Sequence, residues 1–477
     1  MSTDTTISAE QKSIQLRIKE PQFESGIWPC PQDLLGRHAE IENLSPVLLN
    51  AQSPLVFAID APWGGGKTTF FRLWQHYLNN ESKVSLYLNA WESDFAEDPL
   101  LPMLSVLDRW LNDQSNTPSA RAAWEKAKTY TPSIIKATAV AAAKAATFGV
   151  LDLDKEYEKL ASELTGGAVG SLVDSFNIKQ KSLDRFKAQL SKALEALPEG
   201  QENLILFIDE LDRCKPTYAV EVLERIKHLF DIDRLVFVLA INRDQLSKSL
   251  QGVYGSSFDG THYLKRFIDL DYHLNLVDVN AYVNTRIKQP DILDYFKSRN
   301  SEKKDYEYGA EVLSFLAERF EYTPRDIDQL VVRLRLVLRS IPKNHYMDTP
   351  ILIPLMVLRQ ENPELYRRYI ANAKHANEVA EFILNGPIGN VIFNHSMAVA
   401  VGYLIAAGRD PFEQVSTEHI ITPWRDWYDR MMKNDPQARV VNTVIEFASD
   451  LRDFQRRSEI QKLAFERIEL VNKMDIS

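Results

Sequence analysis

A glycine-rich segment near residue 65 carries the residue types that bind phosphate. Residues 61–68 read Ala-Pro-Trp-Gly-Gly-Gly-Lys-Thr and stand between an apolar run, residues 55–60, and a helical pattern, residues 69–78. The glycines let backbone N–H groups curl around phosphate oxygens, and the start of a helix adds a favourable dipole. We therefore expect a phosphate-binding loop of the P-loop type, with Ala61 in the place of its first glycine.

The side chains of this loop predict that the cofactors are ATP and Mg²⁺. The Lys67 ammonium would reach the β- and γ-phosphates, and the Thr68 hydroxyl would ligate Mg²⁺. The alternative is a glycine-rich turn with a surface lysine, although the order of strand, loop and helix favours the nucleotide site. The loop residues that we expect to contact the nucleotide are Ala61, Trp63, Gly64, Gly65, Gly66, Lys67, Thr68 and Thr69.

An acidic turn follows the third apolar run, residues 204–208. Asp209 stands at the end of that run, where ligands gather in a parallel sheet, and we expect it to hold Mg²⁺ through water as a Walker B aspartate. Glu210 would orient or deprotonate the attacking water. The alternative is a solvated acidic turn, and it has most weight for Asp212.

Three further polar residues are candidates for contacts with the γ-phosphate. Asn242 follows the fourth apolar run as a sensor 1 residue would, but it could instead cap the helix that starts near Asp244. Arg266, beside Lys265, could be an arginine finger for a neighbouring subunit or part of a solvated pair. Arg325 follows Thr323 and Pro324, which open a helix; it could be a sensor 2 residue, or a surface arginine paired with Asp328.

The apolar runs predict the fold that must position these residues. They are short and lack clean alternation, which is typical of a mainly parallel sheet covered on both faces by helices. About 110 helical residues separate the second run from the third, far more than an ordinary crossover needs. We therefore expect an α/β P-loop NTPase fold with a parallel five-stranded sheet, a long helical insertion and a helical C-terminal region. The five runs are residues 55–60, 84–90, 204–208, 235–241 and 267–274.

The same pattern predicts the division of the chain. The expected parts are a polar lead-in at residues 1–26, a core at residues 27–99 and 200–276, an insertion at residues 100–199, a helical lid at residues 277–345 and a C-terminal helical region at residues 346–477.

The composition of the chain excludes some classes of protein function. The chain has 477 residues, and 56 Lys and Arg against 66 Asp and Glu leave a net charge of −10, which argues against general coating of nucleic acid. The tract with Arg333, Arg335 and Arg339 leaves a local basic face open. Two cysteines cannot make a disulfide framework, and the N-terminal residues lack the pattern of a secretory signal, so we expect a cytoplasmic protein.

With these residues in view, the chain resembles the KAP family of P-loop NTPases, a branch of the additional-strand (ASCE) class that includes the phage-exclusion protein PifA. Four segments carry the resemblance across residues 33–325. They are Asp33 to Arg37 ahead of the loop, the tryptophan-containing loop from Trp63 to Thr68, the Asn-Ala-Trp-Glu segment from Asn89 to Glu92, and the extended acidic turn from Ile208 to Cys214.

The resemblance also marks two departures. Many relatives insert transmembrane helices between the loop and the acidic turn, whereas this insertion carries Lys136 and Lys144 in its Ala-rich stretch and is too polar to span. This implies a soluble branch whose insertion packs on the protein, lies on the inner membrane or binds a partner. Asn242 stands where many relatives carry an acidic residue, which puts its sensor role in doubt.

Taken together, these features predict Mg²⁺-dependent ATP hydrolysis that drives a conformational or assembly switch. The resemblance implies a role in bacterial anti-phage defence, with further copies of the chain or partner subunits of a multi-component system. The alternatives are a nucleotide-gated scaffold or signalling protein with little turnover, a small-molecule kinase, and an ATP-dependent machine that associates with nucleic acid.

Overall fold

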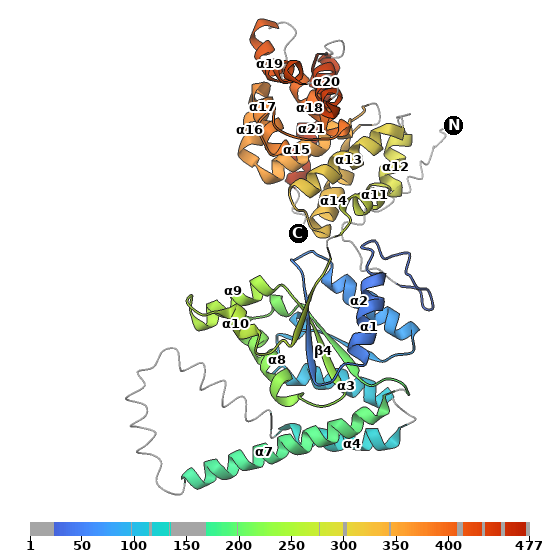
Figure 1. The fold of residues 1–477 in the computed structure, drawn as a ribbon, viewed down its shortest axis with the longest axis vertical. Coiled ribbons are helices and arrows are strands. Elements are labelled where there is room, and N and C mark those ends of the chain that lie inside the picture. The colour runs from blue at the N-terminus through green and yellow to red at the C-terminus, as the bar shows by residue number, and fades with distance from the viewer. Residues whose placement is uncertain are drawn as a thin grey trace, which may run out of the picture. The chain divides into compact units, whose positions relative to one another are not determined.

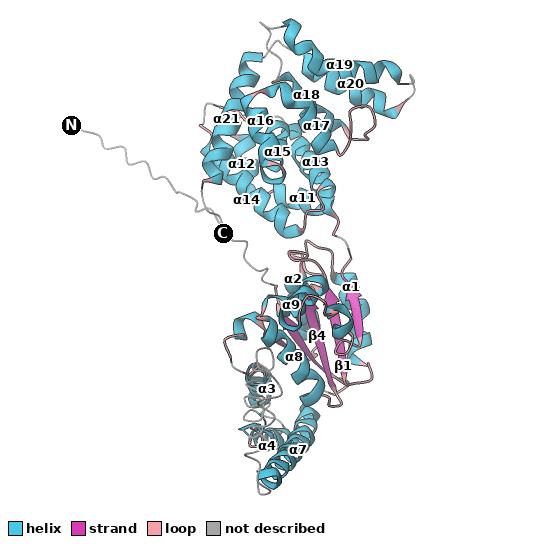
Figure 2. Ribbon diagram, turned by 90° about the vertical axis from the view of Figure 1, so that its left-hand side faces the viewer, coloured by secondary structure: helices cyan, strands magenta, loops and turns pink. Residues whose placement is uncertain are grey.

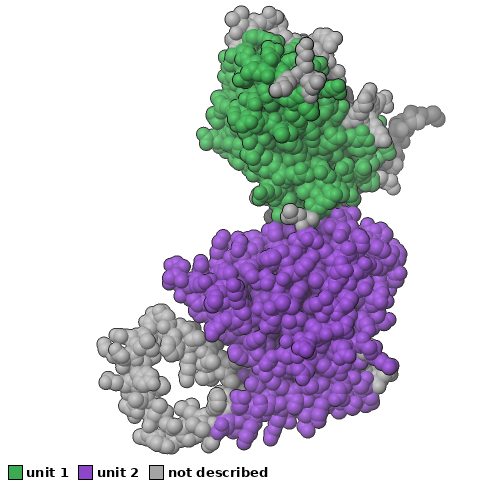
Figure 3. All heavy atoms as spheres, viewed as in Figure 1, with its two compact units in different colours: residues 1–20, 277–477 green, residues 21–276 purple. Residues whose placement is uncertain are grey.

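The computed structural model forms two compact units, residues 21–276 and a unit that contains residues 277–477 (Figure 3). It describes residues 23–96, 98–113, 117–132, 134, 168–197, 199–275, 277–298, 303–342, 345–407, 414–431, 435–449 and 454–473.

The first unit is built on a five-stranded parallel sheet, as predicted. The order of its strands is β2-β3-β4-β1-β5, so β4 lies between the strand that precedes the glycine-rich loop and the strand that precedes the acidic turn. This inserted strand is the feature that names the additional-strand class. The strands are β1 (Leu55–Asp60), β2 (Ser85–Asn89), β3 (Leu204–Asp209), β4 (Leu235–Ile241) and β5 (Leu270–His273).

Both faces of the sheet are covered, which explains why the central strands lack polar alternation. On one face, Phe57 and Phe207 pack with α1 (His38–Leu49) and α2 (Lys67–Asn80). On the other face, Ala58 belongs to a core that includes α8 (Pro216–Leu229). The expectation of five buried runs is wrong for β5, because this edge strand has one neighbour and Leu270 is 50% exposed.

The insertion packs against the same core. Its described helices are α3 (Leu100–Asp113), α4 (Pro118–Lys128) and α7 (Ala168–Ala193), followed by the short η2 (Leu194–Ala196). α7 spans 26 residues and lies beside α4 (Figure 1). The Ala-rich residues 135–151 lie outside the described residues. Within the described part of the chain, none of the helices combines the length and apolar character needed to cross a membrane.

Two more α-helices and two short 3-10 helices complete the described part of this unit. α8 follows the acidic turn, and α9 and α10 connect β4 to β5. The segments not yet given are η1 (Trp91–Ser93), η3 (Leu211–Arg213), α9 (Arg243–Tyr254) and α10 (Gly260–Leu264).

Among its described residues, the second unit contains helices joined by loops and no strand (Figure 2). Thr323 and Asp326 form a reciprocal capping box at the start of α14, with Pro324 at the first position, as predicted. Asn385 ends α17 with a left-handed φ of 64°. The helices are α11 (Val279–Ile287), α12 (Pro290–Lys297), α13 (Lys303–Arg319), α14 (Pro324–Ser340), α15 (Thr349–Glu361), α16 (Pro363–Ala371), η4 (Ala373–His375), α17 (Ala376–Leu384), α18 (His395–Ala406), α19 (Gln414–Arg430), α20 (Pro436–Ser449) and α21 (Phe454–Asn472). A division of this unit near residue 345 stays a prediction.

Candidate functional site

The glycine-rich loop joins the end of β1 to the start of α2. The Ala61 N–H donates to the Ile241 carbonyl at 3.2 Å and fastens the loop to the neighbouring β4. Gly66 has a φ of 91°, and a Cβ atom there would lie 2.5 Å from Cδ1 of Leu35. Only glycine combines this left-handed backbone with so close an approach. The loop thus presents backbone N–H groups at the N-terminus of a 14-residue helix, a geometry suited to phosphate.

Lys67 is buried at the base of this loop, with 8% of its surface exposed. Its ammonium donates to the Ala61 carbonyl at 2.8 Å and lies 3.7 Å from Oδ2 of Asp212. Burial lowers the pKa of Lys67, and the nearby carboxylates of Asp212, Asp209 and Asp60 oppose that shift. The ammonium is therefore held in a desolvated place that further negative charge would stabilise.

Asp212 connects three segments through one oxygen. Its Oδ2 accepts the Trp63 indole N–H at 2.7 Å and the Asn242 backbone N–H at 3.1 Å, besides facing Lys67. Its side chain is 2% exposed, so the interpretation of Asp212 as part of a solvated turn is wrong. This buried carboxylate ties the loop to the acidic turn and to the end of β4.

Asp209 is buried at the end of β3, with 1% of its surface exposed. The Tyr87 hydroxyl donates to its Oδ2 at 2.9 Å, and the Glu210 N–H donates to its Oδ1 at 2.8 Å. Tyr87 and Glu210 therefore fix the orientation of this carboxylate, and each oxygen keeps a lone pair for a further donor.

Glu210 stands on the turn itself, with a φ of 58° that is uncommon for a residue with a side chain. Its Oε1 is bound by the Arg213 guanidinium at 2.9 Å. The turn thus directs the Glu210 carboxylate toward Arg213, three residues later.

The residues present fit an octahedral, oxygen-bound Mg²⁺. Mg²⁺ usually takes one or two protein oxygens, several waters and phosphate oxygens, rather than a full protein cage. Thr68 and Asp209 offer a hydroxyl and a buried carboxylate of this kind. The described residues contain no group of three or more His, Cys, Asp and Glu side chains arranged to hold a metal ion.

The structure places the other candidates less centrally. The Asn242 side chain accepts the Gln245 N–H at 3.1 Å and caps α9, the alternative to a sensor role. Arg266 is exposed, with its guanidinium 5.9 Å from the centre of the Tyr263 ring.

Arg325 is exposed near the start of α14, in the helical unit. Asp328, the alternative partner of Arg325, is paired instead with Arg286 at 2.7 Å. The roles of Arg266 and Arg325 toward a nucleotide stay predictions.

Two residues of the site were missed by the sequence analysis. Tyr87 carries no motif, and only the pairing of β2 with β3 brings its hydroxyl to Asp209, 122 residues later in the chain. Arg213 stood within the acidic turn, but its contact with Glu210 depends on the left-handed backbone of that turn.

Arg37, which precedes the glycine-rich loop, has a structural role that the sequence pattern did not predict. Arg37 is 2% exposed, and its guanidinium donates to Glu40 at 2.8 Å and to the Asn275 carbonyl at 2.9 Å. Glu40 in turn accepts the Tyr272 hydroxyl at 2.8 Å. This buried pair fastens the start of α1 to the end of β5, while Leu35 lies against Gly66 of the loop.

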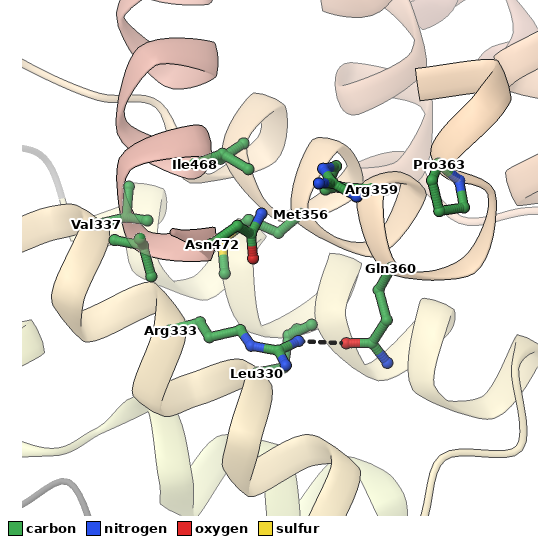
Figure 4. Close-up of a pocket in the computed structure, with 10 residues that line it drawn as sticks. Leu330, Arg333, Val337, Met356, Arg359, Gln360, Pro363, Ile468 and Asn472 are labelled. Atoms are coloured by element: carbon green, nitrogen blue, oxygen red, sulfur yellow. Dashed lines mark hydrogen bonds between the residues drawn. The ribbon is translucent and has the colours of Figure 1, made fainter. Parts of the chain in front are cut away.

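The helical unit contains a separate cavity of about 270 Å³ between α14, α15 and α21 (Figure 4). Leu330, Met356 and Ile468 line its apolar side. On its polar side, Arg333 donates to Gln360 at 2.7 Å, and Arg359 binds Glu469 at 2.9 Å. Its size is at the low end for a ligand pocket.

Comparison with known proteins identifies the family of the chain. The family model described as KAP family P-loop domain matches residues 37–341, more than half of the chain. The Phage T7 exclusion protein of Escherichia coli (strain K12) is 22% identical in an alignment of 359 residues. The alignment covers 72% of this chain and 47% of that protein. The chain therefore spans about half the length of this curated relative.

Two solved structures are more distant. One, of a DNA replication initiation factor, is 12% identical with a TM-score of 0.27 and covers 90% of this chain and 93% of that one. The other, the ORC2 protein of Aeropyrum pernix in ADPNP–ADP complexes, is 13% identical with a TM-score of 0.29 and covers 88% and 95%. TM-scores this low carry no argument about function. The family match and the geometry of the loop agree: the chain belongs to the KAP family of P-loop NTPases.

Proposed function

We propose that the chain is an Mg²⁺-dependent ATPase whose hydrolysis cycle drives a change of conformation or assembly. The observation that carries the proposal is the position of the buried Lys67 ammonium. It lies between the carbonyls of the glycine-rich loop and the carboxylates that follow β3, where the phosphates of a nucleotide would supply its charge partner.

The residues around Lys67 have distinct expected parts in hydrolysis. The backbone N–H groups of the loop and Lys67 would bind the β- and γ-phosphates, and Thr68 and Asp209 would hold Mg²⁺. Mg²⁺ would neutralise the charge of the phosphate oxygens. Glu210 would orient a water and accept its proton as the water oxygen attacks the γ-phosphorus, so that ATP and water yield ADP and inorganic phosphate.

We assign this activity to bacterial defence against phages, with further copies of the chain or other subunits as its partners. The support is the similarity to the Phage T7 exclusion protein, which is low in identity and covers half of that protein. The defence role is tested by the survival of cells that carry the intact gene or the variants below when they are challenged with phage.

The test of hydrolysis is the variant Glu210→Gln in the full chain. It removes the proton acceptor and keeps the size of the side chain, so we expect ATP to bind as in the wild type. Release of inorganic phosphate should fall at least ~100-fold. The matched control is Glu202→Gln, which changes an exposed glutamate just before β3 and should leave the rate unchanged. Undiminished phosphate release in Glu210→Gln would contradict the proposal, as would a phosphorylated small molecule in place of free phosphate.

A second candidate function is a scaffold that nucleotide binding switches on, with little turnover. One observation favours it: the Glu210 carboxylate is paired with Arg213 at 2.9 Å rather than left open to water. The two functions separate in cells. A scaffold should keep protecting against phage when Glu210 is changed to Gln, whereas a hydrolytic switch should lose protection.

A further inference from the structure

The helical insertion begins beside the residue that we expect to activate water. Asn89 ends β2, and its side-chain oxygen accepts the backbone N–H groups of Trp91 and Glu92 at 3.1 and 3.2 Å. The Glu92 carboxylate accepts from the Asn89 amide in return, at 3.0 Å. These bonds shape the short helix η1, so the Asn-Ala-Trp-Glu segment is a cap that sets the position of the Trp91 ring.

Trp91 meets the acidic turn through Arg213. The Arg213 guanidinium lies 5.6 Å from the centre of the Trp91 ring, while its NH1 binds Oε1 of Glu210 at 2.9 Å. The Arg213 and Glu210 side chains are 28% and 16% exposed, so solvent screens this pair only partly. A cation that shares its charge between an aromatic face and a carboxylate holds both groups in place.

The residues that lead into the insertion also form hydrogen bonds with the segment that follows the acidic turn. The Lys215 ammonium donates to the Asp94 carbonyl at 3.2 Å. Arg225 of α8 binds the Asp98 carboxylate through two nitrogens, at 3.1 and 3.0 Å, and Asp98 is 5% exposed. Asp98 also accepts the Leu100 N–H at 2.9 Å, in the first residue of α3. A displacement of α3 would therefore strain the part-buried Arg225–Asp98 pair and the exposed Lys215–Asp94 bond, which connect the residues before α3 to the residues after the acidic turn.

We propose that Trp91 and Arg213 form a latch on Glu210, through which the helical insertion sets the rate of nucleotide hydrolysis. While Arg213 is bound to Oε1 of Glu210, it holds that carboxylate on the side of Trp91 and blocks this oxygen from an attacking water. When the insertion moves Trp91, Arg213 loses its aromatic support and Glu210 is released toward water. Arg213 is thus a positioning residue, and the inference rests on the proposed hydrolysis at the same site.

Two substitutions open the latch from its two ends. Arg213→Ala removes the cation, and Trp91→Ala removes the ring that supports it. We expect each to raise kcat for phosphate release about 3- to 10-fold, with KM and the dissociation constant for ATP within two-fold of the wild type. Because both act on one contact, the double variant should release phosphate no faster than Arg213→Ala alone.

Two controls separate the latch from a general loosening of the fold. Trp91→Phe keeps an aromatic face for the guanidinium and should stay near the wild-type rate. Arg319→Ala removes a cation that lies 4.8 Å from the Phe320 ring in the helical unit, and it should leave kcat unchanged. Equal ATP affinity in all variants shows that each one is folded.

Hydrogen–deuterium exchange gives a readout that does not need turnover. In the full chain, Arg213→Ala should speed exchange at residues 90–98, which lead into the insertion, with or without ATP. Unchanged or lower kcat in Arg213→Ala and Trp91→Ala, or unchanged exchange at residues 90–98, overturns the latch even where Glu210→Gln abolishes phosphate release. Faster exchange in a chain whose phosphate release does not depend on Glu210 supports the latch as a contact and overturns the proposed hydrolysis.

Discussion

Each unit of the molecule buries an aspartate between a cation and an aromatic donor. In the helical unit, Oδ2 of Asp328 accepts the Tyr282 hydroxyl at 2.9 Å and one nitrogen of Arg286 at 3.1 Å, and a second Arg286 nitrogen lies 2.7 Å from Oδ1 as an ion pair. In the first unit, Asp212 accepts the Trp63 indole at 2.7 Å but lies 3.7 Å from the Lys67 ammonium. The Arg286–Asp328 ion pair is in direct contact, whereas the Lys67 ammonium and the Asp212 carboxylate are farther apart.

The difference separates a structural pair from a site that can exchange partners. Asp328 has an arginine in direct contact with both of its oxygens, and burial raises the pKa of this carboxylate. Lys67 divides its donors between a loop carbonyl and a more distant carboxylate, and burial lowers its pKa. A phosphate could replace Asp212 as the partner of Lys67 without breaking a tight ion pair.

The largest expected effect is that of a substitution at Lys67. The variant Lys67→Ala removes the only side-chain cation that touches the carbonyls of the glycine-rich loop among the described residues. We expect it to abolish ATP binding while the chain stays folded, because the loop itself is held by backbone bonds. Equilibrium titration with a fluorescent ATP analogue measures the loss, and circular dichroism checks the fold. Retained affinity would disprove the site.

A second variant tests the Arg286–Asp328 pair. Arg286→Ala leaves the Asp328 carboxylate buried without its cation, which should destabilise the helical unit by about 3 to 5 kcal/mol. The control, Arg368→Ala, removes a pair whose side chains are both 47% exposed and should cost about 0.5 kcal/mol. Urea unfolding measures both. Equal effects in the two variants would show that the Asp328 pair contributes no more than a surface pair.

The smallest expected effect concerns pH. The charge on Lys67 is present below its lowered pKa and is lost as pH rises through it, so ATP affinity should fall on the alkaline side. Asp212 raises the pKa of Lys67, and Asp212→Asn removes that support. The alkaline fall should therefore begin at a lower pH in this variant.

Binding titrations across pH measure this shift. The control is Asp231→Asn, which changes an exposed aspartate of the same unit and should follow the wild-type curve. Identical pH profiles for wild type and Asp212→Asn would mean that the two groups do not interact.

Much of the first unit was predictable, because its signals are local. The runs that became β1 and β3 begin with five apolar residues each and the run that became β4 has seven, and the glycine-rich loop follows β1 directly. Thr323, Pro324 and Asp326 likewise announce the start of α14 within four residues. The edge strand β5 was misjudged as buried, since its position in the sheet depends on strand order and not on its own residues.

The sequence by itself determined the phosphate-binding loop, the carboxylates that follow β3 and the presence of a helical insertion, because spacing along the chain encodes each of them. The tertiary structure decided which donors those groups have. Trp63 meets Asp212 across 149 residues, and Tyr87 meets Asp209 across 122, so both contacts depend on the order and register of the sheet. The same long-range pairing sets Trp91 beside Arg213 and gives the insertion its route to Glu210.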